Sequence, residues 1–190
     1  DAVAHGVGAV AAILGLDDEP VIAACLRAEE GEVVRAVNFN APGQVVIAGH
    51  AGAVDRAIAL AQEAGAKKAV KLPLSVPVHS PLMTPAAERF AGRLSEVTFS
   101  SPAIPVLNNV DVTAHTQPER IRDLLSQQLH SPVRWADTIH AFDAAGVDMV
   151  IESGPGKVLA GLNRRVVRRM GISAMVDVAS IDKALAQCSE

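Results

Sequence analysis

The chain has 190 residues, of which 49% are hydrophobic and 20% charged, so it can bury one large core or two small ones. Its formal net charge of −4 argues against nucleic-acid binding, which favours a marked basic excess. We expect no membrane span and no signal peptide, because no apolar run is long enough to cross a bilayer and no basic start precedes one. Cys25 and Cys188 have no motif spacing and indicate reduced thiols, so a cytoplasmic α/β protein is expected.

The first part of the chain predicts strands and helices in alternation. It opens at Asp1 without a methionine and runs at once into an apolar stretch, so we expect a preceding segment. Four segments have the pattern of strands: residues 7–16, 33–39, 44–48 and 69–76. Pro73 argues that the fourth is an edge strand or contains a bulge. Two segments have helical periodicity, residues 19–30 and 52–65, and residues 40–43 predict a turn.

The resulting order, β-α-β-β-α-β, is that of the split-βαβ or ferredoxin-like arrangement. It predicts a small subdomain over residues 6–76. Residues 77–190 would then form a second region of different character.

The second region predicts further strands and helices. Strands are expected at residues 104–108, 147–151 and 172–178, and helices at residues 82–95, 117–129, 132–146, 157–170 and 179–187. Thr116 to Glu119 has the spacing of a capping box for the second helix. Fully apolar strands between helices favour a parallel sheet covered on both faces. Three strands are few for such a sheet, which agrees with a preceding segment.

His79 is the first candidate for chemistry, because it lies in a rigid Pro-framed loop that leaves a strand. Near the end of the helix over 117–129, Gln128 belongs to the inward face, and carbonyls in a last helical turn lack partners. Such a carbonyl can accept the Nδ1 proton of an imidazole and leave Nε2 as a base. The alternatives are a structural loop histidine and an ordinary core glutamine, and the residues alone leave both open.

Other polar segments are weaker candidates. The amides of Asn38 and Asn40 lie close enough to bind a polar ligand, or they satisfy the backbone of a turn. The Gly-rich turn over 152–157 opens a helix and resembles an anion site, although it lacks the P-loop spacing. Four arginines near residues 164–169 are either a solvated helix end or a docking face for an acidic partner, with Lys67 and Lys68 as a second basic spot. Neither a metal-ligand cluster nor a GxSxG elbow is present in the sequence.

Six separated segments, in order along the whole chain, resemble the malonyl-CoA:acyl carrier protein transacylases. They are GAVAAILGL (8–16), VNFNAPGQVVIAG (37–49), SVPVHSPLM (75–83), PVLNNVDV (105–112), SPVRW (131–135) with Gln128, and ESGPGKVLAGL (152–162). The resemblance implies an α/β-hydrolase-like acyltransferase domain with an inserted ferredoxin-like subdomain. It also implies ping-pong transfer of malonyl from malonyl-CoA to the phosphopantetheine thiol of acyl carrier protein in fatty acid biosynthesis. That chemistry needs no metal or redox cofactor.

Residue by residue, the resemblance makes His79 the general base and Gln128 the residue whose backbone carbonyl orients the imidazole. It places Asn38, Asn40 and Val158 along the approach of CoA or pantetheine. Val78 falls at a position that shapes the acyl pocket.

The family's elbow serine, its oxyanion-hole segment and its malonyl-binding arginine do not occur among these 190 residues. We therefore expect the chain to be an incomplete acyltransferase domain, inactive alone, with a preceding segment of the same enzyme as its partner. Two alternatives are a non-catalytic module that binds carrier protein and the acyltransferase domain of a polyketide or fatty acid megasynthase.

Overall fold

The computed structural model describes residues 3–4 and 6–188, so Asp1 and the last two positions of the predicted second region, 189 and 190, lie outside the described residues. The chain forms two compact units, the first ending at Trp135 and the second beginning at Ala136. Each unit has a sheet of its own, with four strands in the first and two in the second.

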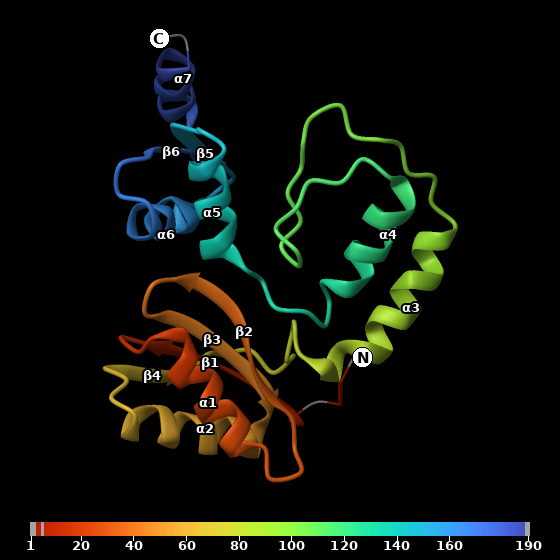
Figure 1. Ribbon diagram of the computed structural model, residues 1–190, viewed down its shortest axis with the longest axis vertical. Helices are drawn as coiled ribbons and strands as arrows, with labels where there is room; N and C mark the ends of the chain where they lie inside the picture. Colours follow the sequence, from red (N-terminus) through yellow and green to blue (C-terminus); the bar gives the residue numbers. More distant parts are fainter. Residues whose placement is uncertain (1–2, 5, 189–190) are drawn as a thin grey trace. The chain divides into compact units, whose positions relative to one another are not determined.

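The sheet of the first unit is antiparallel throughout, with the strand order β2-β3-β1-β4. Its strands are β1 (Gly8–Leu14), β2 (Val34–Ala41), β3 (Gln44–His50) and β4 (Lys68–Lys71). Helices α1 (Asp18–Ala28) and α2 (Ala51–Glu63) connect them, as Figure 1 shows. The β-α-β-β-α-β order expected from the sequence is present, and β4 is an edge strand, as Pro73 suggested.

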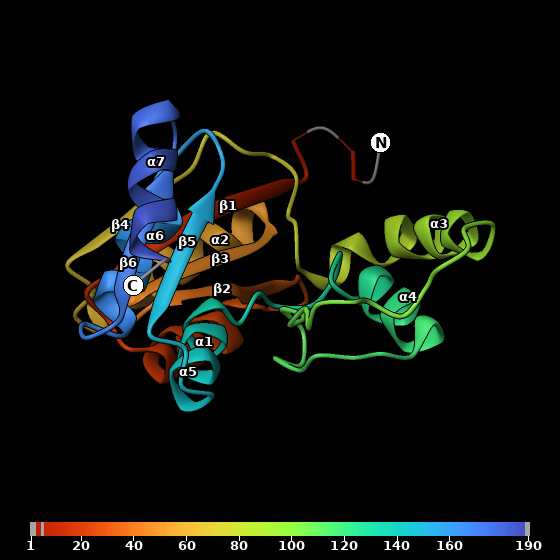
Figure 2. The ribbon, with the colours of Figure 1, turned by 90° about the horizontal axis from the view of Figure 1, so that it is seen from above.

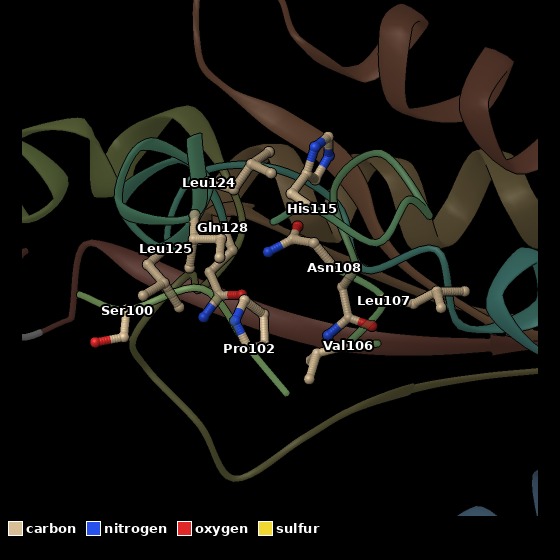
Figure 3. A pocket seen from close by; sticks show the side chains of 11 residues that line it. Ser100, Pro102, Val106, Leu107, Asn108, His115, Leu124, Leu125 and Gln128 are labelled. Atoms are coloured by element: carbon tan, nitrogen blue, oxygen red, sulfur yellow. The ribbon is translucent and has the colours of Figure 1, made fainter. Parts of the chain in front are cut away.

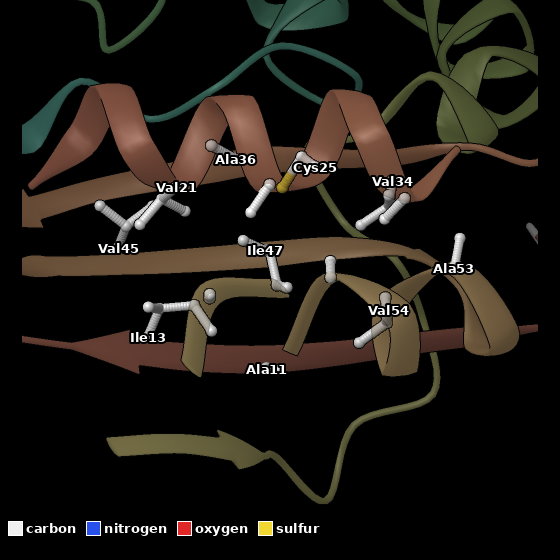
Figure 4. Close-up of a cluster of buried hydrophobic side chains, with 14 of the residues drawn as sticks. Ala11, Ile13, Val21, Cys25, Val34, Ala36, Val45, Ile47, Ala53 and Val54 are labelled. Atoms are coloured by element: carbon white, nitrogen blue, oxygen red, sulfur yellow. The ribbon is translucent and has the colours of Figure 1, made fainter. Parts of the chain in front are cut away.

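One face of this sheet and the two helices enclose the main core (Figure 4). Alternate residues of each strand point to this face because strand side chains alternate with a period of two. Ile13, Ile47 and Val54 are almost fully buried there. Cys25 lies in the same core, and burial raises the pKa of its thiol to about 12, although Arg35 acts to lower it.

Close packing within the sheet depends on one glycine. A Cβ added at Gly49 would lie 2.0 Å from the carbonyl oxygen of Val33 and 2.6 Å from the Cα of Val34. Any other residue would therefore push β2 away from β3 at this point.

On the other face of the sheet, Val10, Val37 and Ala48 form a smaller buried cluster. Beside it, Val133 forms an isolated parallel bridge with β2, since its amide donates to the Val37 carbonyl and the Phe39 amide donates to the Val133 carbonyl, each at 2.9 Å. The predicted start of a helix at Ser131-Pro132 is therefore wrong. Val133 is extended because its amide and its carbonyl both bond to β2, and α5 (Trp135–Ala144) begins three residues after Pro132.

The remainder of the first unit is a short 3₁₀ turn, η1 (Pro81–Met83), with helices α3 (Thr84–Ser95) and α4 (Pro118–Gln127). The two helices lie side by side in both views (Figures 1 and 2) and share buried Ala87, Leu94 and Leu124. Gln117, not Thr116, is the N-cap of α4, and its side chain makes no capping hydrogen bond. The predicted capping box is wrong because Pro118 sets the first helical position one residue later.

Three other predicted elements of the first unit differ from the structure. Residues 104–108 form no regular strand and contribute only the isolated bridge between Leu107 and Ala114. Pro105 removes one backbone donor there, and no neighbouring strand is present among the described residues. Strand β4 ends at Lys71 because Pro73 cannot continue the ladder. The turn predicted at 40–43 is shorter, since Asn40 still belongs to β2.

The second unit contains two parallel strands, β5 (Met149–Ser153) and β6 (Gly171–Met175), with helices α6 (Val158–Val166) and α7 (Val178–Gln187). The parallel pairing agrees with the continuous apolar character of the predicted strands. Helix α6 ends at Val166, earlier than predicted, because Val167 is already extended. Within the described residues, no helix has the length and apolar content needed to cross a membrane.

Candidate active site around His79

The loop that carries His79 turns sharply between Pro77 and Ser80. The Ser80 amide donates to the carbonyl of Pro77 at 3.3 Å, and the Ser80 hydroxyl donates to the same oxygen at 2.7 Å. Inside this turn His79 has a φ of +63°, in the left-handed region that residues with a side chain rarely adopt. This conformation costs about 1 to 2 kcal/mol for an L-residue, so the surrounding contacts must hold it.

Two consecutive carbonyls at the end of α4 bind His79. The backbone amide of His79 donates to the Leu129 carbonyl at 3.0 Å. Its Nδ1 lies 2.6 Å from the carbonyl oxygen of Gln128, which is the C-cap residue of α4. A carbonyl oxygen can only accept, so Nδ1 must carry a proton, and the neutral ring then has its lone pair on Nε2. The contact expected between these two residues is present, and its geometry suits a ring that takes protons at Nε2.

A cavity of about 310 Å³ borders the same helix end. Figure 3 shows it between α4, which contributes Leu124, Leu125 and Gln128, and the segment around Val106 to Asn108. Its lining is largely apolar, and Ile104 and Val106 nearby are 75% and 65% exposed. Gln128 therefore connects two features, since its backbone oxygen holds His79 and it also lines the cavity.

A second histidine, His115, also lines this cavity, and a carboxylate holds it. Asp111 Oδ2 accepts from His115 Nε2 at 2.9 Å and from Arg120 at 3.0 Å. Desolvation by partial burial acts to raise the pKa of Asp111, but the hydrogen bonds from His115 and Arg120 outweigh it and hold the pKa below its ordinary value of 3.8. This cluster fixes the loop between the segment 104–108 and α4.

The other candidates of the first unit lie apart from these contacts. Asn38 and Asn40 are half-buried on β2, and their side-chain amides make no hydrogen bond within the part of the chain that the structure describes. Val78 precedes His79 in the turn and is exposed. Lys67 and Lys68 are exposed at the start of β4, where no carboxylate among the described residues pairs with them.

Val158 belongs to the second unit, as the first residue of α6, and is 72% exposed. The Gly-rich turn before it does not leave the helix end open to an anion. The carboxylate of Glu152 accepts the Ala160 amide at 2.7 Å, so the protein supplies its own anion there. The anion site expected at 152–157 is therefore already filled by Glu152.

Sequence reasoning missed Leu129 and Ser80. The Leu129 contact uses a backbone carbonyl just past the end of α4, and the unpaired carbonyls of that helix end were the available signal. Ser80 is fully buried directly after His79, and a serine between a histidine and a proline was the available signal. Among the described residues, no three His, Cys, Asp or Glu side chains gather as metal ligands.

Comparison with known proteins places this chain in a family. The family model described as "Acyl transferase domain" matches residues 3–184, and the chain belongs to this family. The α/β class expected from the sequence is confirmed by solved structures of the same kind.

More particularly, the chain is similar to malonyl CoA-acyl carrier protein transacylases. It is 50% identical over 187 residues to the one of Salmonella typhimurium and 54% identical over 181 residues to that of Haemophilus influenzae. These matches cover 98% and 95% of this chain, but only 60% and 58% of the relatives. The chain thus spans about 60% of the length of the curated relatives it matches.

Solved structures agree. An acyl carrier protein S-malonyltransferase from Vibrio cholerae has a TM-score of 0.95 at 54% identity, over 96% of this chain and 60% of that one. A second solved structure is described as a type II polyketide acyl carrier protein in complex with its malonyl-transacylase. Its matching chain has a TM-score of 0.96 at 46% identity, and the match covers 98% of this chain and 60% of the matching chain.

Proposed function

We propose that this chain is part of a malonyl-CoA:acyl carrier protein transacylase, which moves a malonyl group from malonyl-CoA to the phosphopantetheine thiol of acyl carrier protein. The names of relatives at 50–54% identity support this activity. As the family resemblance implies, the reaction would belong to fatty acid biosynthesis, and the composition of the chain favours a cytoplasmic protein. The observation that carries the proposal is the 2.6 Å contact between His79 Nδ1 and the Gln128 carbonyl, because it leaves Nε2 as a base.

In the first half-reaction, Nε2 of His79 takes the proton of a serine hydroxyl while the serine oxygen attacks the malonyl thioester carbon. The carbon–sulfur bond then breaks, and the imidazolium returns its proton to the departing thiolate of CoA. Gln128 stabilises the ring throughout, because its carbonyl binds the Nδ1 proton and fixes the orientation without adding a charge. The serine would come from outside these 190 residues.

In the second half-reaction, His79 Nε2 takes the proton of the carrier protein's thiol, which attacks the malonyl-serine ester. The carbon–oxygen bond to serine breaks, and the imidazolium protonates the serine oxygen. One thioester has then replaced another, and the serine is regenerated. No step of this cycle changes an oxidation state, and each proton that is transferred passes through Nε2 of His79.

The remaining site residues have binding roles in this proposal. The unpaired amides of Asn38 and Asn40, and Val158 in the second unit, would contact CoA or pantetheine. Val78, adjacent to the base, would contact the acyl group. Lys67 and Lys68 would attract an acidic carrier protein.

We further propose that residues 6–76 form a ferredoxin-like subdomain inserted in an α/β-hydrolase-like domain, of which residues 77–190 are the C-terminal part. The strand order β2-β3-β1-β4 supports the first statement. The exposed apolar side chains of Ile104 and Val106, beside an apolar cavity, support the second. A preceding segment of the same polypeptide, consistent with the length of the relatives, would cover that surface and supply the serine and an arginine for the malonyl carboxylate.

The test is a transfer assay with labelled malonyl-CoA and holo acyl carrier protein, using the complete polypeptide. His79→Ala should lower the rate by about 10²- to 10⁴-fold, the usual contribution of a general base. His140→Ala, which removes an exposed histidine of α5, is the matched control and should leave the rate unchanged. A loss of less than about tenfold in His79→Ala would show that this imidazole is not the base.

A second candidate is malonyl supply to polyketide synthesis, favoured by the similarity to a malonyl-transacylase bound to a polyketide carrier protein. Rates of malonyl transfer to a fatty acid carrier protein and to a type II polyketide carrier protein distinguish the two. A preference for the polyketide carrier would move the assignment to that pathway without changing the chemistry.

A further inference from the structure

We propose that Ser80 is a positioning residue for His79, whose hydroxyl holds the backbone turn that presents Nδ1 to the Gln128 carbonyl. This inference rests on the proposed function, in which His79 is the base. Nothing in the role of Gln128 alone explains why the ring stays at that carbonyl, because His79 must also keep an unfavourable backbone conformation. Ser80 supplies the missing restraint.

The turn is closed mainly by the side chain of Ser80. Both its amide and its hydroxyl donate to the Pro77 carbonyl, but the amide distance of 3.3 Å is long, whereas the hydroxyl distance is 2.7 Å. The usual N–H···O distance is about 2.9–3.0 Å and the usual O–H···O distance about 2.7–2.8 Å. The hydroxyl therefore makes the well-formed bond, and the backbone bond of this turn is the weaker of the two.

Burial makes this bond difficult to replace. Ser80 has an exposed fraction of 0%, and Pro77 is also among the most buried residues. A buried hydroxyl that lost its acceptor would remain unsatisfied, because solvent does not reach it. The carbonyl of Ser80 in turn accepts the Met83 amide at 3.0 Å, so the same residue joins the turn to η1.

The restraint acts on His79 through its left-handed φ of +63°. A residue with a side chain leaves this region unless its neighbours prevent it. If the Pro77–Ser80 closure loosens, a change in φ at His79 rotates both its amide, now on the Leu129 carbonyl, and its ring, now on Gln128. The tautomer preference would then weaken, although His79 and Gln128 are themselves unchanged.

The experiment compares Ser80→Ala, Ser80→Cys and Ser95→Ala in the complete polypeptide. Ser95 is the matched control, since its hydroxyl makes the same 2.7 Å bond to a carbonyl three residues earlier, Gly92, but in an exposed position. The first readout is the ¹⁵N spectrum of the His79 ring, assigned by its loss in His79→Ala. The second is the pair of steady-state constants for malonyl transfer.

We expect the wild-type ring to carry its proton on Nδ1 and Ser80→Ala to show a mixture of tautomers. In Ser80→Ala, kcat should fall by about 10- to 100-fold, as expected for a misplaced catalytic group, with an unchanged KM for malonyl-CoA. Ser80→Cys, which keeps a weaker donor at the same place, should recover part of the Nδ1 tautomer preference and part of kcat. Ser95→Ala should match the wild type in both.

A wild-type ¹⁵N spectrum and kcat in Ser80→Ala would overturn the inference. If Ser80→Ala fails to fold, Ser80→Cys becomes the test of the inference. A wild-type tautomer in Ser80→Cys would then overturn it. If instead Ser80→Ala mixes the tautomers while His79→Ala still transfers malonyl at the wild-type rate, the proposed function fails and the positioning role of Ser80 stands.

Discussion

Two histidines of the first unit are held by oxygen acceptors of different kinds. The Gln128 carbonyl binds Nδ1 of His79, whereas the carboxylate of Asp111 binds Nε2 of His115. A carbonyl fixes the orientation and tautomer of the ring and has no charge of its own. A carboxylate shared between a histidine and Arg120 instead ties a loop together. The difference suits a catalytic role for the first histidine and a structural role for the second.

The Asp111 cluster predicts a pH-dependent contribution to stability. Because its folded-state pKa lies below 3.8, the charged carboxylate stabilises the folded chain above that value, and this contribution is lost as the pH falls through the folded-state pKa. Asp111→Asn should lower the free energy of unfolding by about 1 kcal/mol near neutral pH. This difference from the wild type should disappear as the pH falls into the acid range. Urea unfolding at a series of pH values measures it.

Asp123→Asn on the exposed surface of α4 is the control for the Asp111 variant and should follow the wild type throughout. A destabilisation by Asp111→Asn that stayed constant into acid would mean that the lost contact is not the ionised one.

At the scale of elements, the C-terminal end of α4 organises the site, since the carbonyls of Gln128 and Leu129 both bind His79. Unpaired carbonyls are a property of every helix end, so the residues alone left a carbonyl partner for His79 open, and the family resemblance singled out Gln128. Sequence periodicity likewise predicted β1 to β3 and α1 and α2 to within a few residues. In those elements, alternation and helical spacing reflect one buried face.

The failures have particular causes. The positive φ of His79 could not be predicted, because that conformation normally indicates Gly or Asn and depends here on contacts distant in sequence. Pro132 suits a first helical turn and so predicts a helix from residue 132, but the pairing of Val133 with β2 decides the structure there. Residues 104–108 have the composition of a strand, but beyond the single bridge from Leu107 to Ala114 no strand pairs with them among the described residues. The functional roles of the site residues remain predictions.

Lys67 and Lys68, at the start of β4, allow a test of the proposed docking of acyl carrier protein. Lys67→Glu with Lys68→Glu should slow transfer to acyl carrier protein while leaving acylation by malonyl-CoA unchanged, because only the protein partner presents an extended acidic surface. The two half-reactions are measured separately by rapid quench. Arg89→Glu with Arg93→Glu on α3 changes the net charge equally and is the control. Equal losses in both half-reactions would assign the lysines a structural role.

At the scale of the molecule, the first unit encloses two buried apolar clusters and also exposes apolar side chains around a cavity. Exposed apolar patches next to a cavity usually mark an interaction surface. The relatives are longer than this chain, and their additional residues are the proposed cover. The proposed active site would then be completed only when the two portions of the polypeptide associate.

This arrangement predicts complementation. The 190-residue chain alone should neither become acylated by malonyl-CoA nor transfer malonyl, and adding the preceding segment as a separate polypeptide should restore part of the activity. Transfer assays on each part and on the mixture measure it. Ile104→Asp with Val106→Asp should prevent restoration, whereas Val97→Asp at another exposed apolar position should not. Robust transfer by the chain alone would refute the proposal.

The pairing of Val133 with β2 has a consequence for the behaviour of the molecule in a crowded solution. An open sheet has two edges whose free backbone groups can recruit strands from other molecules and begin fibrillar aggregation. Here the β2 edge is partly occupied by Val133, and the β4 edge is only four residues long with a lysine at each end. Both features disfavour the addition of a strand from another molecule, so each edge of the small sheet resists self-association.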